Sequence, residues 1–152
     1  IRTRRLQPCC FEHLERIGGS LWVEGVESLL DFTGLESLTE IGRDLTVYNS
    51  DSMVNLSGLE NLSTVGWELY LGRNDALSEL QGLDGLRTIG INLDLDSNPV
   101  LTDVTALHSV TAVGNHLFIT DNTELLTEDA EALRDAIGTD NIDGIVQIQG
   151  NK

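Results

Sequence analysis

Basic residues are scarce in this 152-residue sequence. Lysine and arginine number nine against 25 aspartate and glutamate residues, which gives a formal net charge of −16 at pH 7. The phosphates of nucleic acids and the headgroups of anionic membranes attract basic surfaces, so this deficit predicts that the chain binds neither. A surface this acidic also makes copies of the protein repel one another unless salt or cations screen the charge.

Long hydrophobic runs and most cysteines are missing as well. No apolar stretch approaches the roughly 20 residues of a membrane-spanning helix, so no transmembrane segment is expected. The two cysteines, Cys9 and Cys10, are adjacent, a spacing that rarely reaches relaxed disulfide geometry. Two interpretations stay open: they pair with another chain or with cysteines beyond this sequence, or they are small buried side chains in an N-terminal cap.

What the sequence does contain is a repeat of 24 residues. A β-branched residue followed by glycine recurs at this spacing, as Ile17-Gly18, Ile41-Gly42, Val65-Gly66, Ile89-Gly90, Val113-Gly114 and Ile137-Gly138. Other apolar columns share the register, including Leu21, Leu45, Leu69, Leu93 and Leu117 and, two residues later, Val23, Val47, Leu71, Leu95 and Ile119. The alternation in each Leu-x-Val segment predicts a short strand with one face inward, and apolar positions three residues apart predict bends between strands.

The repeat predicts the fold. One repeat cannot bury its apolar side alone, whereas stacked repeats share a continuous core. We therefore predict a mainly β fold, a right-handed parallel β-solenoid of about six 24-residue turns with short helical caps at both ends. The caps are expected over 8–17 and over 127–137, where Thr127 can be the N-cap and Gly138 ends the helix. A last strand is expected at about 145–149. A basic arm over 1–7 precedes the solenoid domain of 8–152.

Two further columns of the repeat predict how the turns between strands are built. Asn74, Asn98, Asn122 and Asn151 recur after the strands, and their side chains are expected to hydrogen-bond turn backbone. Gly34, Gly58 and Gly82, replaced by Ala106 and Ala130 in the following repeats, mark a tight place where a Cβ is barely tolerated.

The combination Gly-Leu-x-x-Leu-x-x-Ile-Gly-x-x-Leu-x-Val, present as Gly34 to Val47 and in closely related form as Gly58 to Leu71, resembles the receptor L domain. Its strand spacing is one residue longer on each side than that of a leucine-rich repeat. The closing stretch from Ala130 to Asn151 looks like the end of bacterial secreted and surface versions of that domain. The resemblance implies a β-helical fold and an extracellular or cell-surface location. It implies function only weakly, because fold does not fix function.

The outward face of the strands supplies the candidate binding surface. Aromatic residues make up only 5% of the chain, yet four of them are expected on this face, together with two aspartates. The predicted binding-surface residues are Trp22, Tyr48, Tyr70, Asp94, Asp96 and Phe118. Exposed aromatic side chains on a rigid sheet are typical of protein or glycan recognition, and the alternative is local packing against one another, a loop or the arm. We therefore expect a recognition or adhesion module with a protein or glycan ligand.

A second hypothesis is a structural subunit that self-assembles into an extracellular filament or surface layer. Arg2, Arg4 and Arg5 form a basic arm on an acidic body, and Cys9 and Cys10 follow it. Such an arm can reach acidic surface on the next copy, and head-to-tail contacts of this kind propagate. These five residues are the candidates for assembly.

A third hypothesis is a polysaccharide-acting β-helix enzyme, since Asp94 and Asp96 share one face with Glu68 and His116 nearby. The short turns are expected to leave no walled cleft, so we predict no enzymatic activity and no catalytic residues. No metal site or cofactor is expected. Acidic residues do recur in register in the loops, as Glu36, Glu60 and Asp84 among others, and weak calcium binding there is the alternative to solvated charge.

Overall fold

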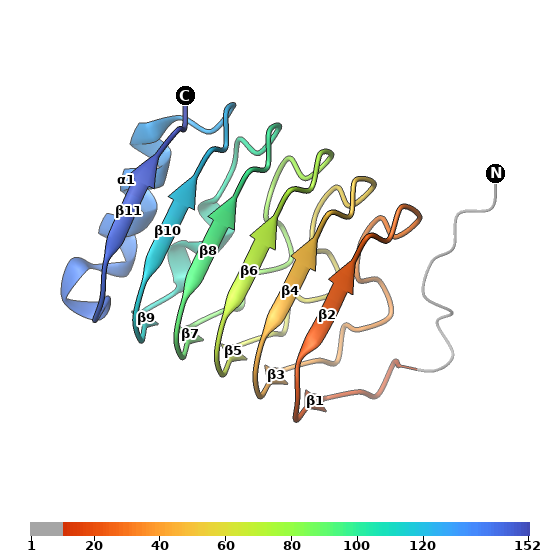
Figure 1. Ribbon diagram of the computed structural model, residues 1–152. Helices are drawn as coiled ribbons and strands as arrows, with labels where there is room; N and C mark the ends of the chain where they lie inside the picture. Colours follow the sequence, from red (N-terminus) through yellow and green to blue (C-terminus); the bar gives the residue numbers. More distant parts are fainter. Residues whose placement is uncertain (1–10) are drawn as a thin grey trace.

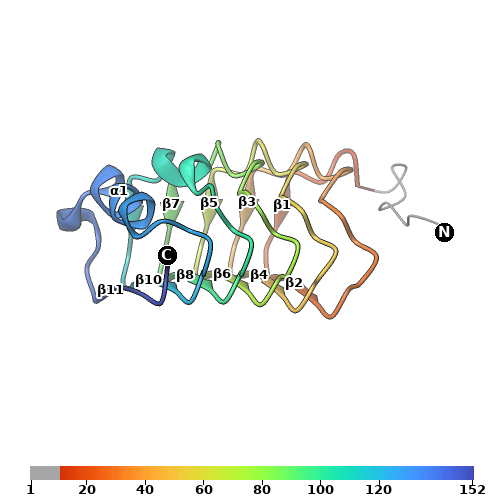
Figure 2. The same ribbon diagram turned by 90° about the horizontal axis from the view of Figure 1, so that it is seen from above.

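The computed structural model describes residues 11–152, which form a parallel β-solenoid (Figure 1). Each turn of the chain gives a two-residue strand to a smaller sheet and a four-residue strand to a larger one, and Figure 2 shows the two sheets on separate sides of the solenoid. The smaller sheet contains β1 (Arg16–Ile17), β3 (Glu40–Ile41), β5 (Thr64–Val65), β7 (Thr88–Ile89) and β9 (Ala112–Val113). The larger sheet contains β2 (Leu21–Glu24), β4 (Leu45–Tyr48), β6 (Leu69–Gly72), β8 (Leu93–Asp96), β10 (Leu117–Thr120) and β11 (Val146–Gln149).

Neighbouring strands pair in parallel, and paired residues are 24 positions apart in the sequence, as for Leu45 opposite Leu69 and Leu69 opposite Leu93. Four complete 24-residue turns separate β2 from β10, so the predicted count of six turns is wrong and the solenoid has about four. The next interval is longer, because Leu117 pairs with Val146 and the connection holds α1 (Thr127–Ile137) and the 3₁₀ turn η2 (Thr139–Asn141). The prediction of a final strand at about 145–149 is confirmed.

The two predicted helical caps have different outcomes. At the C-terminal end α1 is present, but its N-cap is Leu126, and the Thr127 hydroxyl instead donates a hydrogen bond to the Lys152 carbonyl at 3.1 Å. At the N-terminal end the prediction of a helix is wrong over the described residues, where a turn at 11–13 leads into β1. The three-residue spacing of Phe11, Leu14 and Ile17 suits a solenoid bend as well as a helix, and pairing of β1 with β3 decides between them. The arm over 1–7 lies outside the described residues.

The apolar columns fill one continuous core. Strand residues such as Leu45, Leu69 and Leu93 are fully buried, and the side chains of successive turns pack into a single cluster. Each buried leucine adds about 2 kcal/mol of hydrophobic stabilisation, so the stacking of turns is the main driving force of the fold.

The glycine column confirms the prediction of a tight bend. Gly58 and Gly82 have φ of 102° and 105°, and a Cβ on either would collide with backbone of the preceding turn, at Phe32 and Leu56 respectively. Ala106 cannot adopt this conformation without strain, and there the bend becomes the 3₁₀ helix η1 (Thr105–Ser109).

A ladder of buried asparagines joins the turns. The Asn98 side chain is fully buried, and its amide donates to the Leu71 carbonyl at 2.9 Å while its Oδ1 accepts from the Asn74 backbone N–H at 3.1 Å. Asn74, Asn122 and Asn151 make equivalent contacts. The ladder follows a column of residues in the left-handed region, Asn49, Arg73, Ser97 and Asp121, with φ between 51° and 57°. The predicted structural role of these asparagines is confirmed.

Replacement of Asn98 by alanine should be strongly destabilising. The change leaves the Asn74 N–H buried without a partner and removes the second hydrogen bond to the Leu71 carbonyl, so the free energy of unfolding should fall by about 3 kcal/mol in urea titrations. Asn61→Ala is the matched control, because Asn61 is exposed and makes one hydrogen bond, to the Glu36 carbonyl. Equal losses in the two variants would contradict the structural role of the ladder.

Candidate functional site

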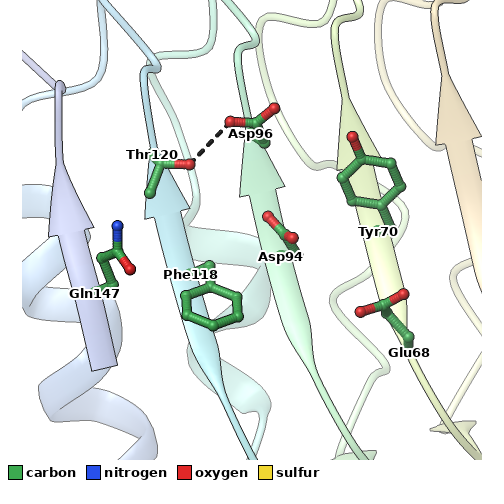
Figure 3. Close-up of a pocket in the computed structure, with 7 residues that line it drawn as sticks. All are labelled: Glu68, Tyr70, Asp94, Asp96, Phe118, Thr120 and Gln147. Carbon is green, nitrogen blue, oxygen red and sulfur yellow. Dashed lines mark hydrogen bonds between the residues drawn. The ribbon is translucent and has the colours of Figure 1, made fainter. Parts of the chain in front are cut away.

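A groove of about 420 Å³ lies on the outer face of the larger sheet, over β6, β8 and β10 and bordered by β11 (Figure 3). Tyr70, Asp94 and Phe118 are register partners on three neighbouring strands, so their side chains form one row across the sheet. Asp96 and Thr120 are partners in the next outward row. The lining residues are Glu68, Tyr70, Asp94, Asp96, Phe118, Thr120 and Gln147.

The first wall of the groove is Tyr70. Its ring stacks on Tyr48 of the adjacent strand, with ring centroids 5.9 Å apart and planes at 23°. Its hydroxyl end lies where a Cβ of Gly72 would be, so the absence of a side chain at position 72 makes room for this orientation. Tyr48 supports Tyr70 from the β4 side, which leaves the side toward Asp94 open to a ligand.

The second wall is Phe118. Its ring lies 5.3 Å from the His116 ring, and His116 Nδ1 accepts a hydrogen bond from the Ile145 backbone N–H at 2.8 Å. This bond fixes the imidazole and ties it to the segment leading into β11. The two aromatic walls therefore belong to a rigid sheet and need no loop to position them.

Three carboxylates lie in the groove in different environments. Asp96 accepts a hydrogen bond from the Thr120 hydroxyl at 2.9 Å, and Glu68 accepts one from the Asn92 amide at 3.0 Å. Among residues 11–152, Asp94 receives no side-chain hydrogen bond and has no cation within 4 Å. Burial, together with repulsion from Asp96 and Glu68, raises the pKa of Asp94 to about 6.

The structure brings together four of the six predicted binding-surface residues, namely Tyr70, Asp94, Asp96 and Phe118. Tyr48 lies behind Tyr70 as its stacking partner. Trp22 is separate: it is 63% exposed on the edge strand β2, donates a hydrogen bond to Glu24 at 3.0 Å, and is separated from Tyr70 by the buried Thr46. The predicted assembly residues Arg2, Arg4, Arg5, Cys9 and Cys10 lie outside the described residues.

Glu68, Thr120 and Gln147 complete the groove and were not among the predicted site residues. All three occupy outward columns that the 24-residue register defines, so the pattern placed them on the correct face. What the pattern could not show is that their neighbours leave a hollow at this point of the sheet.

The acidic residues that recur in the loops hydrogen-bond to the backbone of the glycine bends. The carboxylates of Glu36, Glu60 and Asp84 accept hydrogen bonds from the backbone N–H of Gly34, Gly58 and Gly82 at 2.9–3.1 Å. This explains why an acid follows each of these glycines by two residues. Within residues 11–152 no group of three or more His, Cys, Asp or Glu side chains has an arrangement that could hold a metal ion. Weak calcium binding stays a prediction.

In the part of the chain that the structure describes, no helix has the length and apolar character needed to cross a membrane. Comparison with protein-family models, curated proteins and solved structures finds no match to this chain. Function must therefore be inferred from the geometry and chemistry of the groove.

Asp94→Asn should stabilise the protein in a pH-dependent way. A carboxyl whose pKa is raised by folding opposes the folded state once it ionises, so its cost is small near pH 4, grows as the pH rises and is fully present above about pH 6. The variant should gain about 1 kcal/mol of unfolding free energy at neutral pH, a value reduced from the full shift because water screens this partly exposed group.

Urea titrations of Asp94→Asn at both pH values measure this gain. Asp75→Asn removes one negative charge from an exposed loop and is the control. It should change the free energy of unfolding little. A gain for Asp94→Asn that is the same near pH 4 as at neutral pH would contradict the assignment.

Proposed function

We propose that this chain is an extracellular or cell-surface recognition module that binds a protein or glycan ligand through the outer face of the larger sheet. The observation that carries the proposal is the groove in which Tyr70 and Phe118 flank Asp94. Aromatic walls provide apolar contact area, and a small number of polar groups between them orient a ligand. This combination favours a ligand-binding role for the groove over the alternative that it is an ordinary solvated surface.

The extracellular location and the right-handed, receptor-L-like identity of the solenoid belong to the same proposal. They are supported by the Gly-Leu-x-x-Leu-x-x-Ile-Gly register and by the parallel 24-residue turns into which that register folds.

The proposal does not include catalysis. The groove lies on an open sheet face between short turns, and chemistry that uses two carboxylates as acid and base depends on excluding water. The raised pKa of Asp94 follows from burial and from like charges nearby, which account for it without a catalytic role.

A second candidate function, self-assembly, is favoured by the two edges of the larger sheet. Within the described residues β2 pairs on one side, with β4, and β11 pairs on one side, with β10. In the part of the chain that the structure describes these edges are unpaired, and a parallel edge of this kind can pair head-to-tail with the opposite edge of another copy. Sedimentation velocity of the full chain tests this function: concentration-dependent oligomers under oxidising and reducing conditions support it, and a monomer throughout contradicts it.

The binding proposal predicts a loss of affinity in Tyr70→Ala plus Phe118→Ala. Ligands are first selected with the wild-type protein from a displayed peptide library and from a glycan array. Removal of both walls should weaken their binding at least about tenfold, because truncated aromatic contacts at the centre of an interface cost 2 kcal/mol or more, roughly. Circular dichroism and the midpoint of thermal unfolding confirm that the variant is folded.

Trp67→Ala is the matched control for this experiment. Trp67 is also an exposed aromatic residue, at 45%, but it lies on a bend outside the larger sheet, under the Arg43 guanidinium. Its removal should leave affinity unchanged within about twofold. Ligands that bind the double variant as tightly as the wild type would contradict the proposed function.

A further inference from the structure

We propose that the groove binds an arginine side chain carried by an extended segment of a partner protein, with the guanidinium over Asp94 and between Tyr70 and Phe118. This inference rests on the proposed binding function of the sheet face and names the chemistry of its ligand. It is argued from charge, from the spacing of the carboxylates and from the aromatic walls.

The groove has charge without a counterion. Glu68, Asp94 and Asp96 all line it, and the ion pairs of residues 11–152 lie elsewhere, at Arg16–Glu40, Arg134 with Glu131 and Asp135, and Lys152–Glu124. Arg73, on the neighbouring turn, lies over the Tyr48 ring at 5.8 Å. A cationic ligand would therefore find three carboxylates available, and it would relieve the repulsion between them.

The spacing of these carboxylates favours a ligand with several donors. Asp94 and Asp96 are two residues apart on one strand, so their backbones are about 6.8 Å apart. Glu68 immediately precedes β6 on the neighbouring turn, two residues out of register with Asp94, which makes it a diagonal neighbour whose backbone is about 8 Å from that of Asp94. A guanidinium presents five N–H donors in one plane and can bond to more than one of these groups at once. A lysine ammonium is a compact point charge and satisfies such a spread arrangement less completely.

The aromatic walls suit the same group. Tyr70 and Phe118 are the register partners of Asp94 on the two flanking strands, so a guanidinium over Asp94 would have an aromatic ring on either side. Such rings attract a cation that comes within about 6 Å of their centroids. The planar guanidinium also stacks on such rings, whereas a small metal ion does not. A neutral sugar could stack on the rings but would leave the repulsion among the carboxylates in place.

The size of the groove indicates more than one side chain. At about 420 Å³ it falls in the range of small-ligand sites, which leaves room for the backbone next to the arginine. Gln147 lies at the β11 border of the groove, with an amide that can both donate to and accept from such a backbone. An extended segment lying across β8, β10 and β11 meets both requirements.

The test is a titration with a short capped peptide, Gly-Gly-Arg-Gly-Gly, followed by amide chemical shifts of the full chain at near-physiological salt. The same peptide with citrulline in place of arginine keeps the shape and removes the charge. The arginine peptide should bind saturably, and the citrulline peptide should bind at least about tenfold more weakly.

Three variants separate specific binding from general attraction to an acidic protein. Asp94→Asn plus Asp96→Asn should lower affinity about tenfold. Asp51→Asn plus Asp75→Asn makes the same change in net charge at exposed loop positions and should leave affinity within about twofold. Tyr70→Leu plus Phe118→Leu leaves the charge unchanged and should lower affinity about fivefold.

Several results would overturn the inference. The inference is wrong if the arginine peptide does not bind saturably, or if the citrulline peptide binds with the same affinity. It is also wrong if the two pairs of aspartate substitutions lower the affinity equally, or if stoichiometric calcium displaces the peptide. A neutral oligosaccharide that needs Tyr70 and Phe118 but not the two aspartates would overturn the arginine ligand and leave the proposed function intact. Ligands whose affinity depends on none of these residues would contradict both the arginine inference and the proposed function.

Discussion

From β4 onward, each turn of the larger sheet is joined to the next by the side-chain amide of an asparagine, which is fully buried at Asn74, Asn98 and Asn122. The Asn98 Oδ1 accepts from the N–H of Asn74, its amide donates to the carbonyl of Leu71, and Asn122 repeats the pattern one turn later. Backbone groups at these corners cannot reach water, so their hydrogen bonds must be made inside the protein. The ladder makes them, and in doing so it holds the strands at a fixed register of 24 residues.

The groove is a consequence of that register. Strict alignment sets Tyr70, Asp94 and Phe118 side by side, so a shorter acidic side chain lies between two large rings. Gly72 makes room for the tilt of Tyr70, and stacking on Tyr48 holds that ring in place. A binding surface built this way is pre-formed, which lowers the ordering cost of binding. Its disadvantage is electrostatic, since the same alignment crowds Asp94 with Asp96 and Glu68 and raises the pKa of Asp94.

The sequence was most informative where the repeat is exact. The 24-residue columns predicted the strands of the larger sheet, the structural role of the asparagines, the tight glycine bend and the face on which the aromatic residues lie, but not the two-residue strands of the smaller sheet. It was least informative at the ends, where the repeat fades. Phe11, Leu14 and Ile17 suited a helix as well as a bend, and the choice depends on the long-range pairing of Arg16 with Glu40. The six apolar-glycine pairs suggested about six turns, but the last pair belongs to α1, so about four turns are complete.

The columns of the repeat also do not show which groups each side chain contacts. Trp22 shares an outward column with Tyr70 and Phe118, yet the buried Thr46 separates it from them. Glu60 and its repeats recur in register in the loops, and their carboxylates accept hydrogen bonds from the glycine bend two residues earlier. The order Trp22, Thr46, Tyr70 follows from the register itself, whereas the partner of a loop carboxylate depends on atoms at the end of a flexible side chain, which the repeat does not constrain.

The most direct test of the central claim, that the ligand binds the hollow between Tyr70 and Phe118, is the structure of the chain with a selected ligand bound. A crystal structure of that complex should show the ligand over β6, β8 and β10, in contact with both rings and with a polar group at Asp94. A ligand found on the bends, at the acidic column of Glu36, Glu60 and Asp84, would contradict the account.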